Sequence, residues 1–171
     1  WQHDGQQKTL FNKKESNKCP AGCGEPESHH HYLLCNDARM TKAKQHQLCK
    51  LRQQLYLKNT HPLIISTICK LLQDGTVIAT RYVEENNEEI SILIKEAIEE
   101  NQHLNQTSFE KGFHSLKWNQ AQLIWARTLT KAQQKKQHYW GRDLILITQQ
   151  YTYDLWKARN DILHRHNKKE T

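Results

Sequence analysis

The segment CPAGCGEPESHHHYLLC, which runs from Cys19 to Cys35, constrains this chain more than any other feature of its sequence. It holds three cysteines and three consecutive histidines, while the rest of the 171-residue chain has only two further cysteines. An odd total of five cysteines argues against a disulfide framework and favours thiolates that bind a metal in a reducing compartment. We therefore expect an intracellular protein, in the nucleus or the cytoplasm.

The spacing within this segment is typical of a zinc site. Zinc binds four thiolate or imidazole ligands in a tetrahedron, and these usually come as two short pairs. Cys19 and Cys23 form one pair, and the glycines around Cys23 permit the tight turn that this pair needs. His31 and Cys35 form the other pair, because residues four apart lie on one face of a helical turn. The predicted zinc ligands are Cys19, Cys23, His31 and Cys35.

His29 and His30 are the alternatives to His31. They precede Cys35 by six and five residues, so on a helix their side chains would diverge from the cysteine. A site with four protein ligands leaves no position open for water or substrate, which predicts a structural and non-catalytic zinc. We expect that the chain is not itself an enzyme, although it can be part of a larger one.

Helical periodicity dominates the remaining sequence. Apolar residues recur at spacings of three and four from Asp37 to Lys58, and a sustained apolar stripe runs from Trp140 to Ile162. The stretch TVIATRYV is either an extended connection or a continued helix. The predicted fold is mainly α, with about five helices behind a small loop-rich zinc module. The expected organisation is a polar arm at 1–18, a zinc-binding module at 19–37 and a helical domain at 38–171.

Several local signals predict how these helices begin and end. Thr60 and Ser115 are predicted N-caps, and the helix that Ser115 starts is expected to reach about residue 136. Gly141 marks either a weak point or a turn. Cys49 and Cys69 fall within apolar helical patterns and are expected to be buried thiols.

The charge pattern predicts a polyanionic partner. The formal net charge is +7, and two basic flanks bracket residues 84–110, which carry one Lys or Arg against eight Asp or Glu. No apolar run is long enough to span a membrane, so we expect no membrane partner. The alternative is that the lysines only form a soluble helix face and that Arg159 forms a buried ion pair, with Asp154 or Glu110. The candidate nucleic-acid-binding residues are Arg39, Lys42, Lys44, Lys50, Arg52 and Arg159.

The segment from Cys19 to Cys35 also resembles the zinc-binding segment that follows the polymerase region in reverse transcriptases of non-LTR retrotransposons. The matching residues are Cys19, Pro20, Cys23, Gly24, Glu27, Ser28, His31 and Cys35. Near the other end, LWKARNDILH is similar to a W-x-x-R-N-x-x-x-H ending that is common in mobile-element reading frames, with Trp156, Arg159, Asn160 and His164 in place.

The resemblance implies the C-terminal region of a mobile-element protein, in which the zinc module helps to hold template or target RNA or DNA. No polymerase residues occur in this chain, so the implied role is that of an accessory part of a larger polypeptide. A zinc-stabilised domain for protein interaction or scaffolding is the alternative, with the acidic middle and the aromatic stripes as docking surfaces. A nuclease or another hydrolase ranks third.

Overall fold

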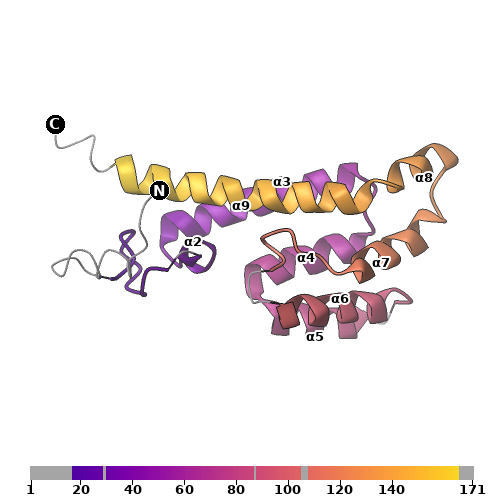
Figure 1. Cartoon of the computed structure of the whole chain (residues 1–171), viewed down its shortest axis with the longest axis horizontal. Coiled ribbons are helices and arrows are strands. Elements are labelled where there is room, and N and C mark those ends of the chain that lie inside the picture. The colour runs from indigo at the N-terminus through magenta and orange to yellow at the C-terminus, as the bar shows by residue number, and fades with distance from the viewer. Residues whose placement is uncertain (1–16, 29, 87, 105–107, 166–171) are drawn as a thin grey trace. The chain divides into compact units, whose positions relative to one another are not determined.

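The computed structural model describes residues 17–28, 30–86, 88–104 and 108–165 (Figure 1). This part of the chain contains eight helices and no strand, and its isolated antiparallel bridge pairs Lys18 with Pro26. The mainly α prediction is confirmed, whereas the prediction of about five helices is too low. Residues 1–16 of the predicted polar arm lie outside the described residues. The helices are α2 (His31–Leu34), α3 (Ala38–Leu57), α4 (Pro62–Asp74), α5 (Thr76–Asn86), α6 (Ser91–Leu104), α7 (Leu116–Ala126), α8 (Lys131–Gln137) and α9 (Trp140–Arg165).

Capping residues explain the larger number of helices. Ser115 starts α7 as predicted, since its hydroxyl accepts a hydrogen bond from the Lys117 N–H at 3.0 Å. The helix does not continue to residue 136, because Thr130 and Gln133 form a capping box that starts α8. The stretch TVIATRYV is helical and forms most of α5.

One predicted cap is wrong. The N-cap of α4 is His61, whose Nδ1 accepts a hydrogen bond from the Leu63 N–H at 3.0 Å. Thr60 instead accepts a hydrogen bond from the Trp140 Nε1–H at 2.8 Å and is buried. Its hydroxyl therefore connects two segments that are distant in sequence, which a local capping rule cannot detect.

The chain divides into two compact units whose boundary falls within α3 and α9. The first unit comprises residues 1–47 and 152–171, and the second comprises residues 48–151. The first unit is therefore discontinuous in sequence. It is discontinuous because residues near the C-terminal end of α9 pack with the segment around Cys19.

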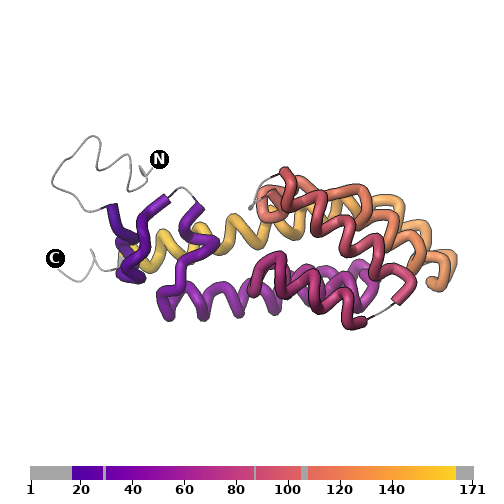
Figure 2. Tube along the Cα trace, turned by 90° about the horizontal axis from the view of Figure 1, so that it is seen from below, coloured from indigo at the N-terminus to yellow at the C-terminus, as the bar shows by residue number. Residues whose placement is uncertain are grey.

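The second unit is built from helices that pack in sequence. Each helix from α4 to α8 packs against the next one, as the tube in Figure 2 lets the reader follow. Leu51 and Leu55 of α3 are fully buried, at the three-four spacing that the sequence shows. The largest fully buried side chains of this unit are Trp118, Leu51, Leu55, Ile64, Ile68, Ile94, Ile98, Leu144, Gln122 and Val83.

Gln122 is the polar member of this core, and all of its amide is used. Its Oε1 accepts a hydrogen bond from the His61 N–H at 3.0 Å, and its Nε2 donates to the Asn59 carbonyl at 2.9 Å and to Gln137 Oε1 at 2.7 Å. Asn59 has a left-handed backbone with φ of 54°, so the turn between α3 and α4 leaves polar groups inside that need partners. Gln122 supplies these partners.

Gly141 is the second residue of α9, directly after the turn at His138 and Tyr139, and the helix continues from it without interruption. A Cβ at this position would lie 2.4 Å from Nδ2 of Asn119 on α7. The glycine therefore allows α7 and the start of α9 to approach closely. Within the described part of the chain, no helix is long and apolar enough to cross a membrane.

Candidate metal centre

A short loop and a single helical turn carry the predicted zinc ligands. The Cys19 N–H donates to the Glu25 carbonyl at 2.8 Å, and the Glu27 N–H donates to the Asn17 carbonyl at 2.7 Å, so the chain from 17 to 27 folds back on itself. Gly22 and Gly24 have φ of 91° and 86°, which L side chains rarely adopt. These glycines are what lets the loop turn on both sides of Cys23.

The four predicted ligands converge on one point. One ligand atom from each of Cys19, Cys23, His31 and Cys35 lies within 4.8 Å of the other three. The sulfurs of Cys19 and Cys35 are 3.9 Å apart, and Cys23 Sγ lies 3.1 Å from His31 Nε2. His31 begins α2 and Cys35 directly follows it, so the helical turn directs both side chains to the same side, as their spacing predicts. His30 is the N-cap of α2, and His29 lies outside the described residues.

This geometry is suited to a metal ion. Around a tetrahedral zinc with Zn–S bonds of about 2.3 Å, two sulfurs lie about 3.8 Å apart, close to the 3.9 Å between Cys19 and Cys35. The distance from Cys23 to His31 is that of a hydrogen bond, and it would lengthen by a few tenths of an ångström around an ion. Three thiolates and one imidazole are ligands for zinc and other thiophilic metals rather than for magnesium or calcium.

Burial controls the protonation of the ligands. It lowers the pKa of His31, against an opposing effect of Glu27 and with a smaller contribution from Arg159. The neutral imidazole that results is the form that binds metals. Burial also raises the pKa of the Cys35 thiol to about 12, and the neighbouring Cys19 adds to this shift. Ionised thiolates in this cluster therefore need a nearby cation.

Two of the predicted phosphate-binding residues, Arg39 and Lys44, donate hydrogen bonds to backbone carbonyls of the segment that carries the ligands. Arg39 donates from Nη2 to the Ala21 carbonyl at 2.9 Å, and its Nε forms an ion pair with Asp37 at 3.0 Å. The hydrogen bond from Arg39 is the main reason that the pKa of Asp37 is lowered. Lys44 donates from Nζ to the Cys35 carbonyl at 3.0 Å. Both cations thus tie the start of α3 to the segments that carry the ligands.

Arg159 has a buried carboxylate partner. Its Nη2 lies 2.5 Å from Glu27 Oε2, and the side chains of Arg159 and Glu27 are only 11% and 7% exposed. Glu27 lies in the ligand loop between Cys23 and His31, so the ion pair attaches α9 to that loop. The ion-pair alternative for Arg159 named Asp154 or Glu110 as the partner, whereas the structure pairs Arg159 with Glu27. The only sequence signal for this pair is that Glu27 and Arg159 each belong to one of the two motifs that resemble mobile-element proteins.

The remaining predicted cations lie on exposed positions of α3. Lys42, Lys50 and Arg52 are exposed, so their side chains are accessible to a partner. The two other cysteines differ from each other. Cys69 is buried as predicted, but Cys49 is exposed, because it follows the buried Leu48 by one residue and therefore lies about 100° around the helix from it.

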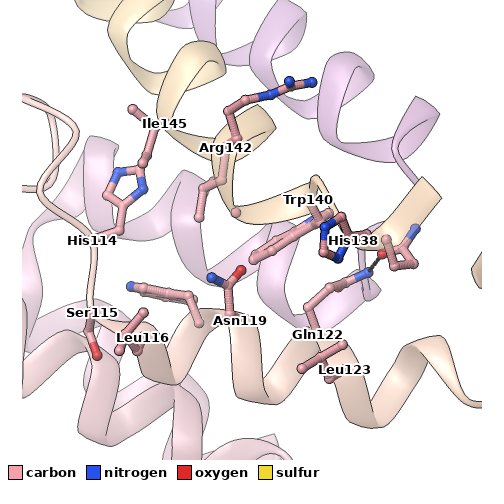
Figure 3. A pocket seen from close by; sticks show the side chains of 14 residues that line it. His114, Ser115, Leu116, Asn119, Gln122, Leu123, His138, Trp140, Arg142 and Ile145 are labelled. Carbon is pink, nitrogen blue, oxygen red and sulfur yellow. Dashed lines mark hydrogen bonds between the residues drawn. The ribbon is translucent and has the colours of Figure 1, made fainter. Parts of the chain in front are cut away.

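A separate pocket lies in the second unit, between α7, the end of α8 and the start of α9. Its volume is about 460 Å³, and Asn119, Gln122, His138 and Trp140 are among its lining residues. Figure 3 shows that the Arg142 guanidinium extends away from the other labelled side chains, while Gln122 is hydrogen-bonded within the pocket wall. The polar groups of Gln122 are thus already used by the protein.

Comparison with known proteins adds no relative to this description. No protein-family model matches the chain, and no match was found among curated proteins or solved structures. The class of the site therefore follows from its geometry alone. It is a Cys₃His cluster that can hold a metal ion, in a protein that is mainly helical.

Proposed function

We propose that this chain is a zinc-stabilised nucleic-acid-binding accessory module of a mobile-element protein. The observation that carries the proposal is the convergence of Cys19, Cys23, His31 and Cys35 to within 4.8 Å of one another. This set leaves no ligand position open, so the role of the metal is structural and the chain performs no catalysis of its own. The mobile-element origin is supported by the resemblance of the two sequence motifs.

The residues around the cluster join three parts of the first unit. Cys19 and Cys23 bind the ion from the loop, and His31 and Cys35 bind it from the first residue of α2 and the residue after this helix. A bound zinc ion supplies the charge that stabilises the thiolates and contributes its binding energy to folding. Ile162 and Leu163 of α9 pack against the buried cluster that contains Cys19 and Cys35. The loop, the start of α3 and the end of α9 are thereby fixed together.

The exposed cations of α3 are what support the proposal of nucleic-acid binding. Lys42, Lys50 and Arg52 are exposed on a helix that begins three residues after Cys35. Exposed Lys and Arg bind the phosphate backbone with little sequence preference and with strong dependence on salt. Arg39, Lys44 and Arg159 act in this proposal as positioning residues, since their cationic groups contact the module itself.

Metal analysis of the purified protein tests the structural part of the proposal. We expect one zinc per chain, and a cobalt-substituted protein with the visible absorption of tetrahedral thiolate coordination. Cys35→Ser should lose the metal and melt at a lower temperature. Cys49→Ser is the matched control, because Cys49 is exposed and outside the cluster. Equal metal content in both variants would contradict the ligand assignment.

A binding titration tests the functional part. Fluorescence anisotropy with labelled single-stranded and duplex RNA and DNA should show binding at about 50 mM salt that weakens steeply at 200 mM. Absence of binding to all four probes at the lower salt concentration would refute the proposal.

A protein-interaction domain is the second candidate. Tyr153 and Trp156 of α9 stack with ring centroids 5.9 Å apart and are 53% and 47% exposed. Exposed aromatic pairs of this kind are common where proteins dock. Retained zinc, together with no affinity for nucleic acid, would favour this function.

A further inference from the structure

The second unit carries a group of cations that the sequence motifs do not single out. From Lys111 to Arg142, both included, the chain has seven Lys or Arg and no Asp or Glu. Five of these seven lie close in sequence around α8, and we call them the α8 basic cluster. They are Arg127, Lys131, Lys135, Lys136 and Arg142.

Among the described residues these cations have no strong acidic partner, whereas several other cations of the unit are ion-paired. Elsewhere in the unit, Lys58 pairs with Asp143 at 2.9 Å, Lys95 with Glu84 at 2.6 Å and Lys117 with Glu96 at 2.8 Å. Among the described residues, no ion pair joins a carboxylate to Arg127 or to any lysine of α8. Arg142 reaches Asp143 only at 3.5 Å, and its side chain is 65% exposed.

The position of α8 is set by its glutamines, which leaves its lysines outside. Gln137 is buried and donates from Nε2 to the Lys58 carbonyl at 3.0 Å, and Gln133 Nε2 donates to Asn59 Oδ1 at 3.1 Å. Lys131, Lys135 and Lys136 are exposed. The sequence KAQQKKQ thus divides by residue type, with amides that face the protein and ammonium groups that face solvent.

The flanking residues extend this exposed basic surface. Arg127 is exposed at the end of α7. On the other side, the Arg142 guanidinium lies 4.8 Å from the centre of the Tyr139 ring, a distance typical of a cation–π contact. Figure 1 shows α8 in the connection from α7 to the start of α9, where the chain reverses its direction.

We infer that the α8 basic cluster is a phosphate-binding surface through which this protein holds the backbone of a nucleic acid. Cations that lie close together without strong acidic partners repel one another. A bound polyanion removes this repulsion, and its binding releases the counterions of the polyanion. A lipid surface fits less well, because α8 has no large apolar residue to insert into a membrane. The inference rests on the proposed nucleic-acid binding and assigns it to residues outside α3.

Two triple variants of the full chain test this assignment. Lys131→Gln, Lys135→Gln and Lys136→Gln remove three charges from α8 and keep good helix formers. Arg81→Gln, Lys95→Gln and Lys117→Gln remove three cations from α5 to α7, of which Arg81 is exposed and the two lysines are half-buried, and serve as the matched control. Circular dichroism should show similar helix content for both. Changing the three lysines of α8 to arginine keeps the charge and should keep the binding.

Anisotropy titrations of labelled duplex DNA and single-stranded RNA provide the readout. The α8 variant should bind about tenfold or more weakly at 100 mM salt, and the slope of log K against log salt should fall by about two to three for duplex DNA. The control should stay within about threefold of the unchanged protein, since Lys95 and Lys117 are paired with carboxylates and Arg81 lies outside the α8 basic cluster.

The possible outcomes separate this inference from the proposed function. If the unchanged protein binds and the α8 variant binds equally well, the inference is wrong and the proposed function stands. If the unchanged protein binds no nucleic acid, both fail. Binding only to phosphatidylserine vesicles, or salt-sensitive self-association seen by light scattering in place of nucleic-acid binding, would also overturn it.

Discussion

The buried ion pair between Glu27 and Arg159 provides the sharpest test of how the first unit is held together. We consider Glu27→Gln, Arg159→Met and the double variant. As whole residues Glu27 and Arg159 are only 6% and 9% exposed. Each single change therefore leaves the other charge buried without its partner. Such a loss costs about 3–5 kcal/mol in the free energy of unfolding. Because Arg159 Nε already lacks a partner among the described residues, we expect about 3 kcal/mol for each single variant.

The double variant separates the ion pair from its surroundings. With both charges removed, no unpaired charge remains, so the two costs should not add and the coupling energy should be about 2 kcal/mol or more. Glu27 also lies in the ligand loop, so each single variant should weaken metal binding, by up to roughly a hundredfold if the whole loss falls on that loop.

Denaturation by urea and transfer of zinc to a coloured chelator measure these two effects. Glu25→Gln and Arg81→Met are the matched controls, because both residues are exposed and should change stability by no more than about 0.5 kcal/mol. Single variants that each cost less than about 1 kcal/mol, with an additive double variant, would refute the structural role of the pair. Arg159 would then again be a candidate for phosphate contact.

Three further predictions concern other positions. Gly22→Ala should lower stability and metal affinity by about 1–2 kcal/mol, since φ is 91° with open space around the site, and unchanged zinc transfer would contradict this. Gln122→Leu should cost about 3 kcal/mol in urea denaturation, because the His61 N–H and the Asn59 carbonyl lose a partner. Burial lowers the pKa of His114 to about 4, so its unfolded form binds more protons, and stability should fall as the pH drops from 6.5 towards 4. Over that pH range the melting temperature of His114→Gln should fall less than that of the unchanged protein. An equal fall in both melting temperatures would contradict this role of His114.

The metal centre shows which parts of a site can be predicted from local sequence. The four ligands lie within seventeen residues, and their positions depend on a turn and on one helical turn. Both are governed by near neighbours, which is why His31 could be preferred over His30 from spacing alone. The ion pair from Glu27 to Arg159 spans 132 residues of sequence, and no local rule relates such distant positions.

The helices show the same distinction. Apolar periodicity predicted α3 and α9, and the Ser115 cap predicted the start of α7, because these signals reflect interactions within a few residues. The break between α7 and α8 was also encoded locally, in the Thr130 and Gln133 capping box, but the prediction joined the two helices. The cap assigned to Thr60 was wrong, because its hydroxyl bonds to Trp140, which is 80 residues away in the sequence.

The sequence by itself determined the helical class, the basic character and the set of residues that can bind a metal. These properties follow from composition and from spacings of a few residues. Only the tertiary structure decided what each cation does. It directs Arg39, Lys44 and Arg159 to partners within the module, and it leaves the α8 basic cluster exposed. The physical reason is that a charged side chain finds a partner within the protein only where another segment packs against it. Which segments pack together is a property of the whole fold.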